Sequence, residues 1–390
     1  MSDGWQAALK NLTDYISQHP NIEISGSSVA IPGDVRADFY RLFDEVTREF
    51  VSGNLPSELK LGAVLSGKWA ELSRSVIRDL KLDSIDMLLS TKWFLDDPLD
   101  GLTRSLFDPL FDVLKGKDDA GHFETVAIEL LRRDFDRYYR EGYRRWAIVA
   151  LIKALAPDRL LLAPAQDSYT ESNLDHSGGG AVGLPNGEVP EPVDTKALSF
   201  ISAPMNAFLA PKIIIHSTLL DAFVSLRPDF HETLWESRSY SGVQEWLDLN
   251  DLIQTHGKHW LWPDMVVYTA DRPRDLALVA DFTRIARPDM NVEFRERADW
   301  FEKEGTGLIL RHHRVLKPRL GSFVVCCEPV LAAAREGFGA ALAAAETGPE
   351  SPAGAEETPG IRLLSVGYDT SELKPIVAEL VSKQQQIKNG

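Results

Sequence analysis

The sequence predicts an α+β protein, with an all-helical N-terminal domain joined by a linker to a C-terminal α/β domain. Three observations predict this class: helical apolar spacing in the first part of the chain, a Gly- and Pro-rich stretch after it, and short β-branched runs alternating with helical segments beyond. At 390 residues the chain also exceeds the roughly 250 to 300 residues at which a single core stops growing. Two domains are therefore expected.

The helical domain is expected over residues 1–163. Apolar side chains recur there at spacings of three and four residues, as at Phe39, Leu42, Phe43 and Val46, which is typical of one buried helix face. Helices are predicted over 3–18, 34–52, 56–80, 82–92, 102–116 and 121–156.

A linker or long loop is predicted over 164–195, where the sequence contains Ser177-Gly178-Gly179-Gly180 and four prolines. Such a segment buries too little apolar surface to offset the entropy lost on ordering. A second segment, at about 346–360, is rich in Gly, Pro, Ala and Glu and is expected to be a disordered insertion.

The α/β domain is expected over 196–390, as a mixed sheet covered by helices. Several of its apolar runs are rich in Ile and Val and have no polar face, as expected of strands buried on both sides. Strands are predicted to begin near Lys212, Met265, Leu276, Ser322 and Ile361, and helices over 216–226, 241–256, 293–315 and 328–345.

The charge and the cysteines restrict the class of protein. A formal net charge of -16 opposes non-specific attraction to nucleic acid and to anionic membranes. The first twenty residues lack the basic and then apolar pattern of an export signal, and no apolar run approaches the roughly 20 residues that span a bilayer. The only cysteines are the adjacent Cys326 and Cys327, which suits a reducing compartment. We expect a soluble, cytoplasmic protein without a membrane partner.

A predicted hairpin carries the most informative motif. Pro263 and Asp264 precede the run MVVYT, a polar turn follows, and a second run ends in Asp281, Phe282 and Thr283. Each strand therefore carries one carboxylate. Together with a preceding helix and a following helix and strand, the segment 241–329 resembles the core of the PD-(D/E)XK, or restriction-endonuclease-like, superfamily.

The resemblance implies a metal-dependent site. In that family the Asp of the PD pair and the acid of the next strand bind magnesium or manganese, which implies Asp264 and Asp281 as metal ligands. Glu245 matches a supporting acid on the preceding helix, so the three acids are the candidate catalytic residues. Carboxylate oxygens suit magnesium, and a bound metal lowers the pKa of water and stabilises charge on phosphate.

The sequence departs from the family pattern at one position. Thr283 stands where the family has a lysine, and a hydroxyl cannot supply its positive charge. Lys303 or Arg295 is a candidate to replace it from a neighbouring element. The structural alternative is that Asp264 is a strand-entry turn residue and Asp281 caps a strand end.

A predicted helix carries arginines among aromatic residues, a combination that can bind phosphates or stack on bases. Acids lie one turn away along the same helix, so a salt-bridged solvent face explains the same pattern. The candidate phosphate or nucleic-acid contacts are Arg133, Arg137, Arg140 and Arg144, and the acids are Asp134, Asp136 and Glu141.

Two other patterns lack essential parts. The stretch from Gly62 to Lys68 has GxxxxGK spacing, but Trp69 stands where a P-loop needs Ser or Thr. The other is a set of soft zinc ligands without recognisable zinc spacing: His256, His259, His312, His313, Cys326 and Cys327.

The first functional hypothesis is a cytoplasmic interaction or accessory protein whose C-terminal domain is a degenerate nuclease-like fold, with another protein as its partner. The alternative is a magnesium-dependent nuclease or phosphodiesterase, although the net charge disfavours nucleic acid. The second alternative is a small-molecule enzyme with a pocket between the two domains.

Overall fold

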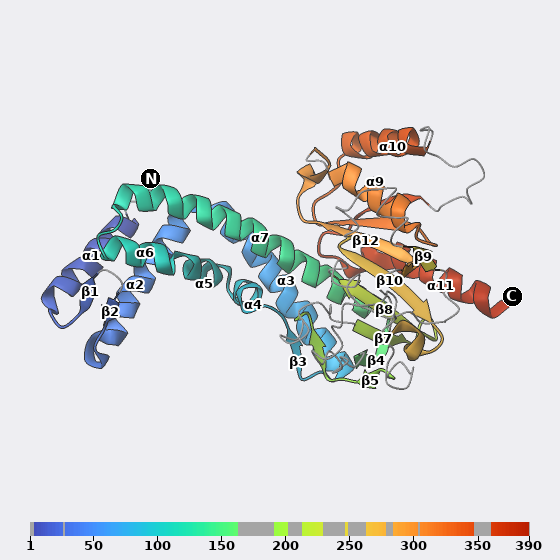
Figure 1. Ribbon diagram of the computed structural model, residues 1–390, viewed down its shortest axis with the longest axis horizontal. Helices are drawn as coiled ribbons and strands as arrows, with labels where there is room; N and C mark the ends of the chain where they lie inside the picture. The colour runs from blue at the N-terminus through green and yellow to red at the C-terminus, as the bar shows by residue number, and fades with distance from the viewer. Residues whose placement is uncertain are drawn as a thin grey trace, which may run out of the picture. The chain divides into compact units, whose positions relative to one another are not determined.

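The computed structural model describes nine stretches of the chain: 4–25, 28–162, 191–201, 213–228, 246–248, 263–277, 284–302, 305–346 and 360–389. They form two compact units, Met1–Glu71 with Leu88–Arg145, and Leu72–Met87 with Trp146–Gly390. The first unit is helical and the second contains a mixed sheet, which confirms the predicted α+β class (Figure 1). The division differs from the expected boundary at 163, because two long helices contribute to both units.

Seven α-helices are described in the part of the chain before residue 155: α1 (Gly4–Gln18), α2 (Gly33–Asn54), α3 (Pro56–Leu80), α4 (Leu89–Asp96), α5 (Pro98–Thr103), α6 (Phe107–Leu114) and α7 (Ala120–Ala154). A short hairpin of β1 (Glu23–Ser25) and β2 (Ser28–Ala30) separates α1 from α2. The start of α5 shows why these residues form helices. The carboxylate of Asp97 accepts hydrogen bonds from the backbone N–H groups of Leu99 and Asp100, and Pro98 occupies the first turn.

The core of the first unit is aromatic. Trp5 of α1 lies 5.1 Å from Phe50 and 5.6 Å from Phe123 between ring centroids, so three helices meet at one cluster. Phe43 and Phe111 form a second contact at 4.9 Å. Burial of such large side chains provides the main stabilisation of a helical domain.

The longest predicted helices are the most accurate, since 3–18, 34–52, 56–80 and 121–156 each match one observed helix to within two residues at either end. The predicted helix 82–92 is wrong over its first part. That part is the strand β3 (Ser84–Asp86), which pairs in parallel with β6 (Ala197–Ser199). The predicted helix 102–116 is interrupted, because a 3-10 turn separates α5 from α6.

The second unit is built on an eight-stranded sheet with the order β14-β13-β12-β10-β8-β7-β4-β5. Neighbours from β5 to β12 are antiparallel, whereas β12, β13 and β14 are parallel. The strands are β4 (Pro157–Leu162), β5 (Val193–Asp194), β7 (Ile213–Ser217), β8 (Ala222–Pro228), β10 (Met265–Ala270), β12 (Met290–Arg295), β13 (Ser322–Cys326) and β14 (Ile361–Ser365). The parallel strands are linked by α9 (Gly305–Leu316) and α10 (Ala332–Glu346), as parallel pairing requires.

Helices cover both faces of this sheet, as the sequence predicts (Figure 1). On one face, Ile309 of α9 and Phe338 of α10 pack with Val324 of β13 in a buried cluster. On the other face, Lys383 of α11 (Lys374–Asn389) reaches Thr269 of β10, with 2.7 Å between Nζ and Oγ1. No helix in the described residues combines the length and apolarity needed to cross a membrane.

Of two further predicted helices in the second unit, one is wrong and the other is correct only in its second half. The segment 216–226 contains the end of β7, a turn and most of β8, and 293–315 begins inside β12 and becomes α9 only at Gly305. Residues 216–217, 222–226 and 293–295 pair across the sheet. Short apolar runs of this kind are compatible with both the 3.6-residue spacing of a helix and the two-residue spacing of a strand. Whether a neighbouring strand is available for pairing decides which structure forms.

Several predicted segments fall on positions without described structure. The greater part of the linker lies in 163–190 and the greater part of the insertion in 347–359, both outside the described residues. The predicted strand from Leu276 begins at the end of the 3-10 helix η5 (Pro273–Leu276), and 278–283 lie outside the described residues. Of the predicted helix 241–256, only 246–248 is described, and it is a strand, β9 (Trp246–Asp248), paired with β11 (Arg284–Ala286).

Candidate functional site

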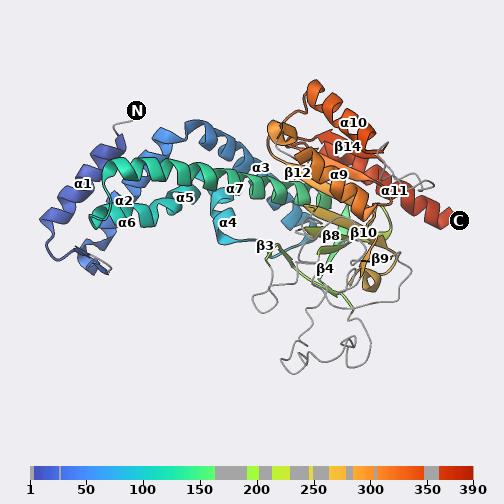
Figure 2. The ribbon, with the colours of Figure 1, turned by 45° about the horizontal axis from the view of Figure 1, so that its top comes forward.

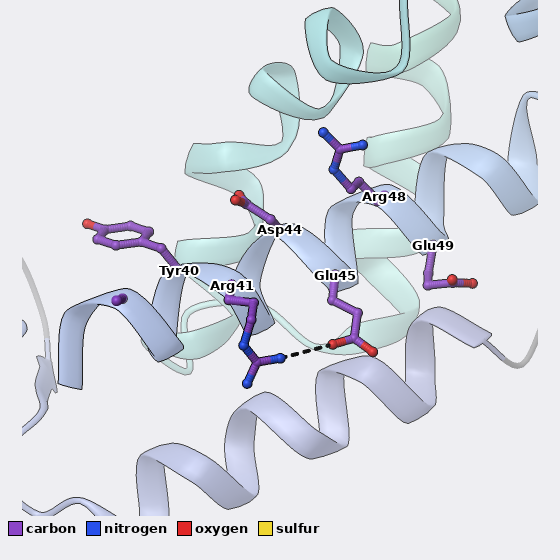
Figure 3. A pocket seen from close by; sticks show the side chains of 7 residues that line it. Tyr40, Arg41, Asp44, Glu45, Arg48 and Glu49 are labelled. Carbon is purple, nitrogen blue, oxygen red and sulfur yellow. Dashed lines mark ion pairs between the residues drawn. The ribbon is translucent and has the colours of Figure 1, made fainter.

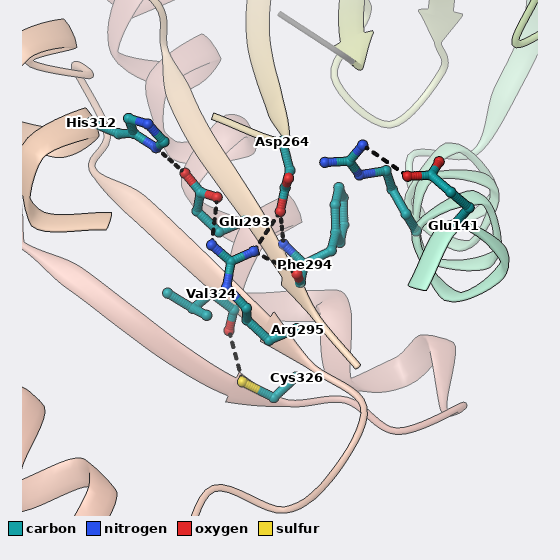
Figure 4. Close-up of polar contacts among 9 residues, drawn as sticks. Glu141, Asp264, Glu293, Phe294, Arg295, His312, Val324 and Cys326 are labelled. Atoms are coloured by element: carbon teal, nitrogen blue, oxygen red, sulfur yellow. Dashed lines mark hydrogen bonds and ion pairs between the residues drawn. The ribbon is translucent and has the colours of Figure 1, made fainter. Parts of the chain in front are cut away.

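Two acids lie side by side where β10 and β12 pair. In this antiparallel register Met265 is opposite Val292, so the preceding Asp264 lies beside Glu293 (Figure 4). Side chains alternate along a strand, which places Glu293 and Arg295 on the same face of β12. The sequence around them, Met-Asn-Val-Glu-Phe-Arg, therefore directs a carboxylate and a guanidinium toward Asp264.

Arg295 joins the two acids. Its Nη1 lies 2.6 Å from Oδ2 of Asp264, and its Nη2 lies 3.0 Å from Oε2 of Glu293. The backbone N–H of Phe294 donates a further hydrogen bond to Oδ2 of Asp264, at 2.8 Å. Asp264 and Arg295 are 16% and 15% exposed, and Glu293 only 2%, so the ion pairs are largely shielded from water.

The electrostatics keep the guanidinium charged. Burial acts to lower the pKa of Arg295, but the adjacent carboxylates of Asp264 and Glu293 outweigh it and raise the pKa. Charge-assisted hydrogen bonds of this type are about twice as strong as neutral ones. The three side chains therefore form one fixed unit at the end of two strands.

A histidine on α9 fixes the other side of Glu293. Nδ1 of His312 lies 2.6 Å from Oε1 of Glu293, and both side chains are almost fully buried. Because a carboxylate has no proton to give, Nδ1 is the protonated nitrogen and donates this bond. The backbone carbonyl of His312 accepts a bond from Nδ2 of Asn291 at 3.3 Å, which ties α9 to β12. Both oxygens of Glu293 are thus bound, one on each side.

This donor set fits a hard divalent cation only in part. Asp264 and Glu293 supply two carboxylates, the number that magnesium often takes from protein when substrate phosphate and water complete its shell. In the part of the chain that is described, no group of three or more His, Cys, Asp or Glu side chains is arranged to hold a metal ion. A cation between the two acids would also have to share them with Arg295.

The predicted site residues have different outcomes. Asp264 is in the site, whereas Glu245 and Asp281 lie outside the described residues, as do Thr283 and Lys303. Arg295, one candidate for the missing charge, contacts Asp264 directly. Sequence reasoning missed Glu293, and it named His312 only as a possible zinc ligand. The signal that identifies Glu293 is the spacing Glu-x-Arg within a run of alternating apolar residues.

The arginines of α7 contact acids of the same helix. Arg133 and Arg137 both pair with the buried Asp134, at 3.8 and 3.1 Å, although their own side chains are 74% and 60% exposed. Arg144 pairs with Glu141 at 3.5 Å. These ion pairs agree with the salt-bridged interpretation of the pattern. Arg140 is exposed, and all four candidate arginines belong to the first compact unit.

The two weaker motifs are not binding sites in the described structure. The GxxxxGK stretch lies inside α3, where backbone N–H groups are used in helical hydrogen bonds and cannot cradle a phosphate. Among the zinc candidates, His312 and His313 contact Glu293 and Ser322, and Sγ of Cys326 lies 3.9 Å from the carbonyl of Val324. His256 and His259 lie outside the described residues.

A groove of about 530 Å³ runs along α2 in the first unit (Figure 3). Both acidic and basic side chains line it, and Arg41 and Glu45 form an ion pair at 3.9 Å. Its lining residues are Ala37, Tyr40, Arg41, Asp44, Glu45, Arg48 and Glu49. Because one helix supplies all of them, the groove does not bear on the predicted pocket between domains.

Comparison with known proteins assigns no family. No protein-family model, curated protein or solved structure matches the chain. What the protein does must therefore be inferred from its own residues, and Asp264, Glu293, Arg295 and His312 form one connected polar cluster.

Proposed function

We propose that the C-terminal domain is a nuclease-like phosphodiesterase that uses magnesium or manganese at Asp264 and Glu293. The observation that supports it most is the arrangement of these acids on adjacent strands, with Arg295 two residues after Glu293. The pattern of a PD pair, an acid and a basic residue two positions on is then complete, with arginine in place of lysine. The proposal takes Glu293, rather than Asp281, as the second acid.

The order of the elements supports the same resemblance to the PD-(D/E)XK superfamily. A hairpin carrying both acids is followed by a helix and a strand, here β10 and β12, then α9, then β13. The pairing of β13 is parallel to β12, so α9 is the crossover helix. Fold resemblance alone does not establish function, and the proposal therefore depends on the side chains of the site.

Each side chain has a distinct part in the proposed reaction. Asp264 and Glu293 would hold the cation, which when bound supplies a water of lowered pKa and neutralises charge on the phosphate. Arg295 would bind a phosphate oxygen through its planar guanidinium, and it cannot act as a base because it stays protonated. His312 holds the carboxylate of Glu293 in place. Water adds to phosphorus and a P–O bond to the leaving alcohol breaks.

The substrate class follows from these groups, which recognise a phosphodiester rather than a base. The net charge of -16 opposes long-range attraction of nucleic acid, so a short or tethered substrate, or one delivered by a partner protein, fits better. Cys326 and Cys327 form no disulfide, and we propose a reducing cytoplasm as the compartment.

An accessory protein with an inactive nuclease-like domain is the second candidate, and one observation favours it. Both oxygens of Glu293 and one of Asp264 already accept hydrogen bonds from protein donors. If those bonds never open, Arg295 permanently takes the place of a metal and the domain serves only as a scaffold for a partner.

Cleavage assays on the purified full chain separate the two. Short fluorescent DNA and RNA strands and bis(p-nitrophenyl) phosphate are incubated with magnesium or manganese, for the native protein and for Glu293→Gln, Asp264→Asn and the exposed control Glu336→Gln. We expect metal-dependent cleavage that falls by at least about a hundredfold in the first two variants and is unchanged in the control. Absence of cleavage on all substrates, with no manganese binding at millimolar concentration, would refute the phosphodiesterase and leave the accessory protein.

A further inference from the structure

The bridge formed by Arg295 has a consequence for cation binding. The guanidinium contacts Oδ2 of Asp264 at 2.6 Å and Oε2 of Glu293 at 3.0 Å, so it lies between the two carboxylates. Any cation held by both acids must approach the same two oxygens. The guanidinium and a metal ion are therefore competitors for one position.

Electrostatics make this competition strong. Charges a few ångströms apart interact strongly when the effective dielectric constant is about 20, well below that of water, and the repulsion between two cations is of the same size. The side chains of Glu293, Arg295 and Asp264 are only 2%, 15% and 16% exposed. Dissolved salt therefore screens the interactions between their charges poorly. A metal and an unmoved guanidinium cannot both occupy the site at low cost.

The other oxygen of Glu293 does not offer a metal an easy alternative. Oε1 of Glu293 accepts the bond from His312, which is 1% exposed and fixed on α9. Rotation of the carboxylate toward a metal would break that buried bond. Displacement of Arg295, which is 15% exposed, costs less than displacement of His312, which is 1% exposed.

Phosphate provides the displaced guanidinium with a new partner. Arginine binds carboxylate and phosphate with the same planar pair of donors, so exchange of one for the other conserves two charge-assisted hydrogen bonds. Arg295 is the last residue of β12, and its partly exposed side chain does not have to cross the sheet to reach such a ligand.

We propose that Arg295 is an internal competitor of the metal, so that the free protein binds divalent cations weakly and a phosphate group tightens their binding by taking up the guanidinium. This inference rests on the proposed function, because it assigns the metal to the same two acids. Thermodynamic linkage requires the effect to be reciprocal: the metal must tighten phosphate binding by the same factor. Typical coupling of this kind changes an affinity by about 5- to 150-fold.

Manganese binding to the full chain tests the coupling directly. Free manganese is measured by electron paramagnetic resonance with and without millimolar thymidine 5′-monophosphate, against a protein-free reference that accounts for binding of manganese to the nucleotide. We expect the nucleotide to tighten manganese binding to the native protein on the order of tenfold. This arm needs no variant, so it stands even if substitutions at the site prevent folding.

Variants test the role of Arg295. Arg295→Met should bind manganese on the order of tenfold more tightly than the native chain without nucleotide, and added nucleotide should then tighten that binding less than it does in the native chain. The matched control is Arg319→Met, which removes an arginine that contacts a different buried acid, Asp289, at 3.3 Å. The control should retain native manganese affinity and native coupling. Addition of Asp264→Asn to Arg295→Met should abolish the tightened binding.

Two results would overturn the inference: unchanged manganese affinity in a folded Arg295→Met protein, or manganese binding to the native chain that the nucleotide leaves unaltered. The failure of the proposed function is a separate outcome. Metal-dependent cleavage without any effect of the nucleotide on manganese binding refutes only the competition between Arg295 and the metal. An effect of the nucleotide on manganese binding without cleavage of any substrate refutes only the phosphodiesterase.

Discussion

Two lysines of α11 form ion pairs of similar length that differ in burial, and we predict that only one stabilises the fold. Lys383 Nζ lies 2.6 Å from Oδ1 of Asp289, with side chains 15% and 1% exposed. Lys388 Nζ lies 2.8 Å from Oδ2 of Asp221, with side chains 48% and 80% exposed. Replacement of each lysine by Met removes the charge but keeps most of the apolar stem.

The expected loss for Lys383→Met follows from what remains around Asp289. Removal of one partner from a buried pair typically costs about 3 to 5 kcal/mol, because the other charge stays buried. Asp289 retains Arg319 at 3.3 Å and the backbone N–H of Thr269 at 2.7 Å. We therefore expect Lys383→Met to lower the free energy of unfolding by about 3 kcal/mol, the lower end of that range. For the exposed pair we expect no measurable change in the free energy of unfolding.

Urea unfolding, with hydrogen exchange by mass spectrometry on the same samples, measures both effects. Exchange assigns each transition to a part of the chain, which is needed because a protein of two compact units need not unfold in one step. The Lys383→Met protein should also lose protection throughout α11. Equal losses in the two variants, or a loss below about 1 kcal/mol at Lys383, would refute the reasoning from burial.

Three further predictions follow from single residues. A Cβ added at Gly101 would lie 2.6 Å from a backbone atom of α4, so Gly101→Ala should lower the free energy of unfolding by about 1 to 3 kcal/mol. A Cβ added at Gly67, inside α3, would meet nothing within 4 Å, so Gly67→Ala should raise that free energy by up to about 1 kcal/mol. Urea midpoints that shift in the same direction for both variants would contradict this prediction. Burial lowers the pKa of His313 from 6.5 to about 4. Between these two pH values the unfolded chain binds a proton at this side chain that the folded chain does not. The free energy of unfolding should therefore fall by up to about 3 kcal/mol as the pH drops from 6.5 to 4. A His313→Gln protein should lose that part of the pH dependence, and an unchanged slope would show that the side chain is not buried as described. Burial also raises the pKa of Cys326 to about 12, so iodoacetamide at pH 8 should modify Cys327 first in the folded protein, as peptide mass spectrometry would report.

The fold of the first unit was predictable because its helices are long and locally determined. The segment 56–80 shows the pattern over seven turns, and the observed α3 has the same two ends. The strands at Met265 and Ser322 were also predictable, since consecutive Val residues in short apolar runs favour buried sheet. In each case the decisive information lies within one segment of sequence.

The second acid of the site was not predictable in the same way. Glu293 and Arg295 fall in a six-residue strand whose alternation is too short to exclude a helix, and the prediction placed both in one. Their proximity to Asp264 depends on the register of β12 against β10, across about thirty residues of chain. No local pattern contains that register. Sequence reasoning therefore took Asp281, the acid of the next predicted strand, as the partner.

The cost of burial supports a functional interpretation of the site. Networks that remove charges from water often contribute no more stability than well-packed apolar residues of the same size. Stability alone therefore gives little reason to keep Asp264, Arg295 and Glu293 together near the end of β12. The pair on the opposite face, Asp289 and Lys383, has a structural role, because it attaches α11 to the sheet. Arg295, by contrast, joins two neighbouring strands that backbone hydrogen bonds already hold together. The bond from His312 attaches α9 to Glu293, but the Arg295 bridge adds no new connection between elements. That bridge is better explained by what it binds than by what it stabilises.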